Sequence, residues 1–283
     1  MLLTKLNNLE KVKIISRPSK VCKTPYVADI ELPNGNIVQA HSASLGCCGL
    51  CEKDCYVLAS SIESNCVNSK SKVCSYKIYL AHMYENKLYN NITITNYQLI
   101  GIDPKLAETL VESALKNNCF NNLKNIKKYR REAKLMNSRF DFIGIDENDK
   151  YFILEVKNVP LADYADVCAK DRKKMDFTDK HPYDKISYFP DGYRKNKGAV
   201  VSERALKHIN ELAEITYSKI IRPIICYVIQ RTDINTFQAS LLDPTYRDAY
   251  LKAKKMGVEI FTLIVEWNEN GEAYFVDKKI IIN

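Results

Sequence analysis

The sequence is poor in the residues and runs that mark several classes of protein. It has nine glycines, nine prolines and one tryptophan in 283 residues, without internal repeats or a linker rich in proline, glycine and serine. No segment approaches the ~20 consecutive apolar residues of a membrane-spanning helix. Residues 1–13 alternate apolar side chains with lysine and asparagine, so they lack the apolar core and cleavage site of a signal peptide. We therefore expect an intracellular protein that is neither secreted nor embedded in a membrane.

Basic residues outnumber acidic ones. The 42 Lys and Arg residues against 34 Asp and Glu residues give a formal net charge of +8. Such an excess favours a polyanionic partner such as nucleic acid, because counterions are released on association. The same charge would also serve solubility alone. Charge by itself therefore leaves both interpretations open.

Ten cysteines are many for a chain without a secretory signal, so we expect thiols or metal ligands rather than disulfides. Six of them fall in one stretch: Cys47, Cys48, Cys51, Cys55, Cys66 and Cys74. The spacing of Cys48 and Cys51 suits one half of a zinc site. Cys66 and Cys74 are too far apart to supply a regular second half. Structural zinc and buried free thiols are the two alternatives for this group.

The first hundred residues are patterned as short β-strands. Segments 27–32 and 37–41 flank Pro33-Asn34-Gly35-Asn36, and Asn-Gly supplies the two positive φ angles of a tight hairpin turn. Further β-like runs cover residues 56–62, 76–82 and 98–102. Several short strands joined by polar turns predict a small barrel or sandwich.

The pattern changes at Asp103-Pro104, where a helix-spaced run of apolar residues begins. We expect helices at 106–116, 203–215 and 245–256, the second of them capped by Ser202. Strands are expected at 126–135, 139–145, 151–156, 223–229, 258–267 and 273–276. This order implies a mixed sheet flanked by helices, and the whole chain is therefore predicted to be an α+β protein. We place a β-domain at 1–103 and a mixed α/β domain at 104–283, with a charged insertion at about 163–187.

Two carboxylates and a lysine fall on neighbouring strands of the second half. If these strands form a hairpin symmetric about Asn148, Asp141 lies directly opposite Glu155. Opposed residues of an antiparallel pair share a face, with Cβ atoms about 4.5–5.5 Å apart. Lys157 follows on that face, because side chains alternate along a strand. Two carboxylates so close repel each other unless a cation lies between them, and oxygen-only ligation suits Mg²⁺ or Mn²⁺ better than zinc.

This group of side chains predicts metal-dependent hydrolysis. Asp141 and Glu155 would bind the ion, with the carbonyl of Val156 as a third ligand, and the ion would acidify a water molecule. The Lys157 ammonium would stabilise the charge that develops on a phosphate. The alternative is a solvated strand face with a surface salt bridge. Apolar residues on both faces of the hairpin argue against it, because buried carboxylates need a partner or a metal.

The wider sequence resembles a known family. A strand Asp, a turn and a strand Glu-x-Lys resemble the PD-(D/E)XK nuclease superfamily. Nearly the whole chain also resembles the sugar fermentation stimulation protein A family through an ordered set of blocks. They include Arg17-Pro18, Asn34-Gly35, Gly101-Ile102-Asp103, Ser138-Arg139-Phe140-Asp141-Phe142, Glu155-Val156-Lys157-Asn158-Val159, Phe189-Pro190-Asp191-Gly192, Lys207-His208 and Asp243-Pro244. The resemblance implies an N-terminal OB-like β-barrel, a C-terminal nuclease-like domain, DNA binding and a role in regulating sugar-utilisation genes.

By position, the resemblance makes Asp141 and Glu155 the metal carboxylates, Lys157 the active-site lysine and Glu112 the acidic residue of the first helix. The candidate contacts to nucleic acid are Arg139, Arg204 and Lys207. His208, on the polar face of the same predicted helix as Lys207, is expected to be structural rather than a general base.

The sequence departs from the family pattern in two places. Family members of this kind carry Pro-Asn-Thr-Gly after the Ala40-His41 pair, whereas Ser42-Ala43-Ser44-Leu45-Gly46 stands here, so a role for that loop is in doubt. The blocks around Glu155 and Phe189 are also separated by the insertion at 163–187. We expect this insertion to be a solvated loop rather than a contact to nucleic acid.

The leading hypothesis is a DNA-binding protein with Mg²⁺- or Mn²⁺-dependent phosphodiesterase activity. One alternative is a DNA-binding regulator that keeps the nuclease fold without cleaving. Another is an accessory protein of sugar metabolism with no direct role on nucleic acid. The intact set of Asp141, Glu155 and Lys157 favours the first.

Overall fold

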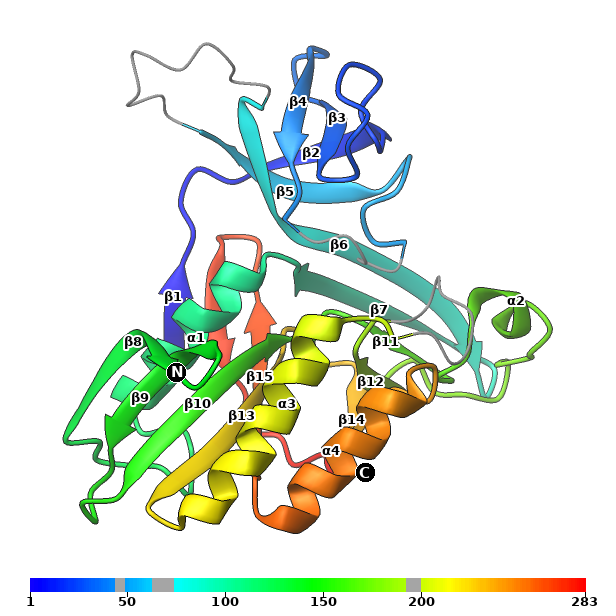
Figure 1. The fold of residues 1–283 in the computed structure, drawn as a ribbon. Helices are drawn as coiled ribbons and strands as arrows, with labels where there is room; N and C mark the ends of the chain where they lie inside the picture. Colours follow the sequence, from blue (N-terminus) through cyan, green and yellow to red (C-terminus); the bar gives the residue numbers. More distant parts are fainter. Residues whose placement is uncertain (44–48, 63–73, 192–199) are drawn as a thin grey trace.

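A small β-barrel lies against a larger mixed sheet that carries helices on both faces (Figure 1). The computed structural model describes residues 1–43, 49–62, 74–191 and 200–283. This is the α+β architecture that the sequence predicts, with the barrel first and the mixed sheet second. No helix in these ranges is both long and apolar enough to span a bilayer.

Five strands close the barrel. Their order is β4-β3-β2-β5-β6, and the parallel pairing of β4 with β6 closes the ring, as in an OB-like fold. Buried aliphatic side chains, among them Ile14, Ile30 and Ile78, fill its interior. The strands are β2 (Glu10–Ser16), β3 (Val27–Glu31), β4 (Ile37–His41), β5 (Tyr56–Ser61) and β6 (Tyr76–Tyr89).

Two hairpins of the barrel have different turns. The expected hairpin of β3 and β4 is confirmed, but only Gly35 of its turn has a positive φ, +83°, because the loop is longer than a two-residue turn. The second hairpin joins β6 to β7 (Ile92–Gly101) through Asn90 and Asn91, which both have positive φ. It is much longer than expected, and it carries the barrel sheet across the second half of the chain (Figure 1).

A seven-stranded sheet forms the centre of the second half. Its order is β1-β16-β15-β13-β10-β9-β8, and β10, β13 and β15 run parallel to one another. The expected strands of this half are confirmed apart from their ends. β1 belongs to this sheet although it precedes the barrel, and the domain division at residue 103 stays a prediction. The strands are β1 (Leu2–Lys5), β8 (Lys128–Leu135), β9 (Ser138–Ile145), β10 (Tyr151–Asn158), β13 (Ile221–Ile229), β15 (Glu259–Trp267) and β16 (Glu272–Phe275).

Helix α1 covers one face of this sheet, and α3 and α4 cover the other. The expected helix at 203–215 is confirmed, and the Ser202 hydroxyl caps it by accepting the N–H of Ala205. Asp103 and Asp243 cap α1 and α4 with their carboxylates. The helices are α1 (Pro104–Lys116), α2 (Ala169–Arg172), α3 (Glu203–Ile215), η1 (Thr216–Ser218) and α4 (Pro244–Met256).

The ends of the charged insertion at 163–187 are built into the fold, whereas residues 170–180 are mostly exposed, so the expectation of a solvated loop is wrong only for the ends. Its ends take part in a second sheet of order β11-β12-β14-β17. Lys87 of the β6–β7 hairpin donates to the carbonyl of Phe177, and Asn96 donates to the carbonyl of Pro182 at 3.2 Å. These hydrogen bonds connect the insertion to the β6–β7 hairpin of the barrel sheet. The strands of the second sheet are β11 (Ala162–Asp163), β12 (Lys185–Phe189), β14 (Ile234–Ala239) and β17 (Ile281–Ile282).

The cysteine group is only partly described. Cys47, Cys48 and Cys66 lie outside the described residues, so the zinc alternative stays a prediction. Cys51 is buried in the barrel core, and the Cys55 thiol donates to a backbone carbonyl of its own loop at 3.1 Å. Cys55 is a free thiol.

Candidate active site

Asp141 and Glu155 meet where β9 and β10 begin to separate. The two strands pair from Tyr151 with Ile145 to Leu154 with Phe142, so the hairpin is centred on Asn148 as predicted. The next opposed residues are Asp141 and Glu155. Beyond this point the Asp141 carboxylate accepts the backbone N–H of Val156 at 2.7 Å. Glu155 is buried, with only 2% of its surface exposed, and Asp141 is partly buried.

Two cationic or polar groups hold one oxygen of Glu155. Lys157 Nζ donates to Glu155 Oε1 at 2.5 Å, and His208 Nδ1 contacts the same oxygen. Lys157 Nζ and His208 Nδ1 lie 3.5 Å apart. The other oxygen, Glu155 Oε2, is buried and has no hydrogen-bond partner within the described residues. Because an unpartnered buried carboxylate oxygen is costly, this atom is the candidate ligand for a cation.

The two carboxyl groups differ in their readiness to ionise. Burial, and then the charge of Glu155, raise the pKa of Asp141 from 3.8 to about 7, against the opposing effects of the Val156 N–H and of Lys157. Burial also disfavours the charged form of Glu155, but Lys157 and His208 outweigh it, so the pKa of Glu155 lies below its ordinary value. Near neutral pH the metal-free pair therefore tends to keep a proton on Asp141. A divalent cation would replace that proton.

The raised pKa of Asp141 makes a prediction about stability without metal. A carboxyl group whose pKa is higher in the folded state contributes stability below its unfolded pKa, and this contribution is lost as pH rises through about 7. We expect Asp141→Asn to raise the free energy of unfolding at pH above 7 by about 1–3 kcal/mol, and to change it little in acid. Urea titrations in EDTA between acid and mildly alkaline pH measure the difference. Equal pH profiles for the two proteins would contradict it.

A cleft of about 590 Å³ opens over the carboxylates. Glu108 on α1, Arg204 on α3 and the carboxylates of β9 and β10 contribute to its lining. Leu161 and Phe189 are among the residues of an apolar wall. The site is therefore a polar recess in which four carboxylates face one lysine and one arginine, beside an apolar surface, a form typical of a ligand-binding site.

The acidic residue of α1 that reaches this cleft is Glu108, and Glu112 is not part of the lining. Glu112 lies one helical turn further along, where it accepts hydrogen bonds from Tyr129 at 2.9 Å and from Arg131 at 3.0 Å. Glu108 also binds Arg131, at 2.8 Å, and its charge contributes to the raised pKa of Asp141. The helix thus brings Glu108 toward the carboxylates and leaves Glu112 in a surface ion-pair group.

The three predicted contacts to nucleic acid lie in different settings. Arg204 lines the cleft. Lys207 is directed to the turn between β8 and β9, where it donates to the carbonyl of Asn137 at 2.6 Å. Arg139, on the surface near the same turn, pairs with Glu132 at 3.0 Å. Only Arg204 therefore shares the recess with the carboxylates.

The polar face of α3 is less solvated than its sequence suggests. His208 is 4% exposed and Glu211 is 7% exposed, because this side of the helix packs toward β10. The His208 ring also lies against Phe140, with ring centroids 5.9 Å apart. His208 is thus a buried partner of Glu155, and its structural role stays a prediction.

The side chains at this site fit a hard divalent cation that takes oxygen ligands and only a few of them from the protein. No group of three or more His, Cys, Asp or Glu side chains in the described ranges is arranged to hold a metal ion. Two carboxylates, one of them with the free oxygen Glu155 Oε2, suit Mg²⁺ or Mn²⁺, which keep several waters and bind substrate phosphate oxygens. Val156, whose carbonyl is the predicted third ligand, also lines the cleft.

Comparison with known proteins gives the family. The family described as "Sugar fermentation stimulation protein RE domain" matches residues 105–170 and 177–271, which is more than half of the chain. The chain belongs to the sugar fermentation stimulation protein family. The resemblance that the sequence motifs indicate is thereby confirmed.

Relatives match this chain along most of its length. A sugar fermentation stimulation protein homolog of Clostridium novyi (strain NT) is 30% identical over 261 residues, covering 91% of this chain and 90% of the relative. A homolog of Alteromonas mediterranea is 28% identical and covers 83% of each chain. The solved structure of Pyrococcus furiosus SfsA in complex with Ca²⁺ aligns over 100% of this chain and 99% of that chain, with a TM-score of 0.71 at 15% identity. At this identity the likeness establishes a shared fold.

Proposed function

We propose that this protein binds DNA inside the cell and hydrolyses phosphodiester bonds with a divalent cation, Mg²⁺ or Mn²⁺, held by Asp141 and Glu155. The observation that carries the proposal is the buried pair of opposed carboxylates, in which Glu155 Oε2 lacks a partner and Lys157 follows on the same face. A metal-bound relative of the same fold, the Ca²⁺ complex from Pyrococcus furiosus, supports the choice of a divalent cation.

Three further polar side chains of the cleft, Lys157, Glu108 and Arg204, have roles in this proposal. The cation would acidify a water molecule and stabilise negative charge on the phosphate. Lys157 holds Glu155 Oε1 and offers its remaining N–H groups to a phosphate oxygen. Glu108 takes the position that the family resemblance gave to Glu112. Arg204, near the start of α3, binds a neighbouring phosphate, helped by the positive end of the helix.

The two parts of the chain divide the work in this proposal. The OB-like barrel, within residues 1–103, grips the nucleic acid, and the nuclease-like part, residues 104–283, carries the cleavage site. OB-like barrels bind strands through basic grooves and aromatic side chains. The net charge of +8 supports a polyanionic partner.

Purified protein incubated with labelled DNA and RNA, with Mn²⁺ or with EDTA, tests the proposal. We expect DNA to be cleaved in Mn²⁺ and not in EDTA. The affinity for DNA should fall by more than roughly tenfold between about 50 and 200 mM salt. Lys157→Ala should lower the cleavage rate by roughly 100-fold or more and leave Mn²⁺ binding intact, because the lysine acts on the phosphate rather than on the ion. Lys174→Ala, at an exposed lysine of the insertion, is the matched control.

The outcomes separate the competing functions. Salt-sensitive DNA binding without any cleavage in Mn²⁺ would identify a regulator that keeps the nuclease fold. Absence of binding to both DNA and RNA at low salt would favour an accessory role in sugar metabolism.

A further inference from the structure

Strand β15 has an edge that is open along its first half. It pairs with β13 from Glu259 to Ile264, but with β16 only from Val265 to Trp267. The bond from the Val276 N–H to the Ile264 carbonyl, at 3.0 Å, is the last backbone bond on that side in the described residues. The chain then leaves β15 and continues into β17 of the second sheet.

On this edge, backbone N–H and C=O groups point to the side where an additional β-strand could pair with β15. Successive residues of a β-strand direct their N–H and C=O groups to alternate edges of the strand. Since the Ile264 carbonyl points to the open side, the backbone groups of Thr262 point there as well. No backbone bond to Thr262 from this side is present in the described chain. An unpaired strand edge of this kind is a template for another extended chain.

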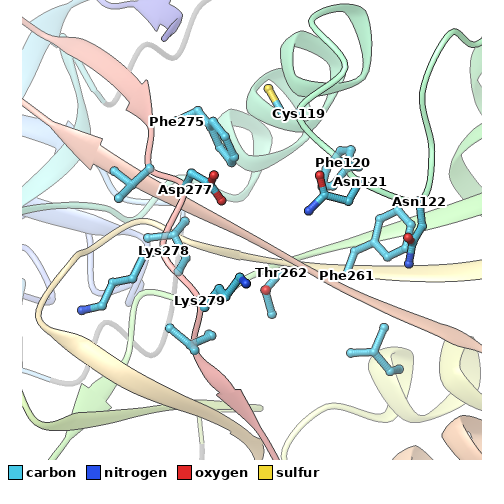
Figure 2. A pocket seen from close by; sticks show the side chains of 14 residues that line it. Cys119, Phe120, Asn121, Asn122, Phe261, Thr262, Phe275, Asp277, Lys278 and Lys279 are labelled. Atoms are coloured by element: carbon cyan, nitrogen blue, oxygen red, sulfur yellow. The ribbon is translucent and has the colours of Figure 1, made fainter.

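A cavity of about 350 Å³ runs along the open edge (Figure 2). Figure 2 shows Phe120 and Phe261 on one side of the cavity and Lys279 directed toward Thr262. The rings of Phe120 and Phe261 lie against each other, with centroids 5.1 Å apart. The residues after α1 and the residues after β16 flank the edge. Such a recess admits a single extended chain, whereas the edge of a second folded sheet would meet these flanks.

The residues that line the cavity determine which side chains an extended chain bound there would need. Side chains of a strand alternate between the two faces of a sheet, so one set would lie beside Phe120 and Phe261 and the next beside Lys279. The aromatic side selects apolar residues. Lys279 has no ion-pair partner among the described residues, whereas Lys278 is directed away to the carbonyl of Thr232 at 3.0 Å. Asp277 also lines the cavity, but Figure 2 shows it beside Phe275 and away from Thr262, so the position beside Lys279 selects an acidic residue.

We propose that the open edge of β15 binds an extended peptide segment of a partner protein by strand addition, and that this segment alternates apolar with acidic residues. Main-chain hydrogen bonds to Thr262 supply affinity, and the contacts of alternate side chains supply specificity. This surface is separate from the carboxylate cleft, because the two cavities have no lining residue in common. The inference does not depend on the proposed nuclease function.

An acetylated, dye-labelled octapeptide that alternates valine with aspartate tests the proposal by fluorescence anisotropy on the full chain. We expect saturable binding, and binding at least tenfold weaker for the same peptide with N-methylated backbone amides. Among the backbone groups, Thr262→Pro removes only the N–H that faces the cavity, at a position where a strand edge tolerates proline. It should also weaken binding at least tenfold, with thermal unfolding measured to show that the fold is kept.

Lys279→Glu is a second variant that leaves the strand itself unchanged. It should weaken binding of the valine–aspartate peptide and strengthen binding of a valine–lysine peptide. The proposal is overturned if the octapeptide does not bind, if N-methylation leaves its affinity unchanged, or if neither variant alters binding. Concentration-dependent dimerisation of the wild-type chain that Thr262→Pro abolishes would assign the edge to a second copy instead, and would also overturn it.

Discussion

Replacing Glu155 by glutamine should weaken the binding of Mn²⁺ to this protein by roughly 100-fold or more. Glutamine keeps the size and shape of the buried side chain but removes the charge that a cation needs. The loss should be severe because Glu155 Oε2 has no hydrogen-bond partner within the described residues and is the oxygen available to the ion. Glutamine would offer the ion only a neutral amide at this position. Asp141→Ala should have the same effect, since it removes the opposed carboxylate. Isothermal titration with Mn²⁺ and with Mg²⁺ measures both losses, and DNA cleavage should disappear with them.

Two glutamates of α1 provide a test position and its matched control. Glu108 lines the cleft and Glu112 does not, although both bind Arg131. We therefore expect Glu108→Gln to lower cleavage and Glu112→Gln to leave both cation binding and cleavage close to wild type. If the wild-type chain and Asp141→Ala bind Mg²⁺ and Mn²⁺ equally well, the carboxylates are structural and the proposed function is wrong.

The arrangement of the carboxylates could be predicted from the sequence because it depends on local geometry. A hairpin centred on Asn148 and a side-chain period of two residues are sufficient to bring Asp141, Glu155 and Lys157 to one face. The choice between Glu108 and Glu112 is different. Both lie on one side of α1 at a spacing of one turn, and only the way the helix packs on the sheet decides which of them enters the cleft.

The second sheet and the insertion could not be predicted for a related reason. β11 and β17 are two residues long, and β12 and β14 pair across a wide separation in sequence, so no local period marks them. The insertion is rich in charge, which indicated solvent exposure. Most of its charged side chains are indeed exposed, but Arg172 pairs with Asp163, which is buried. Composition cannot distinguish charges that face water from charges that face each other.

Asp233→Ala should be strongly destabilising, with a loss of about 3–5 kcal/mol in the free energy of unfolding. Asp233 is fully buried between the barrel hairpin and the second sheet. Its carboxylate accepts hydrogen bonds from Arg231 at 2.6 and 2.7 Å, from Lys185 at 2.7 Å and from Asn96 at 2.9 Å. Because Arg231 and Lys185 are themselves buried, removing Asp233 leaves two cations without their main counter-charge. Lys185 keeps Glu85 as a second partner, at 2.7 Å, which softens the loss.

The pH dependence of stability gives the same network a second test. Burial alone would favour protonated Asp233, but the charges and hydrogen bonds of Arg231 and Lys185 outweigh it and hold the pKa of this carboxyl far below its usual range. A depressed folded-state pKa contributes stability above the unfolded pKa, and this contribution is lost only as pH falls toward the folded value. The wild-type chain should therefore lose stability in acid more steeply than Asp233→Asn. Chemical unfolding followed by circular dichroism compares both variants with Asp179→Ala, an exposed position on the insertion. A cost for Asp233→Ala no larger than for Asp179→Ala would show that this ion-pair network does not hold the barrel hairpin to the rest of the chain.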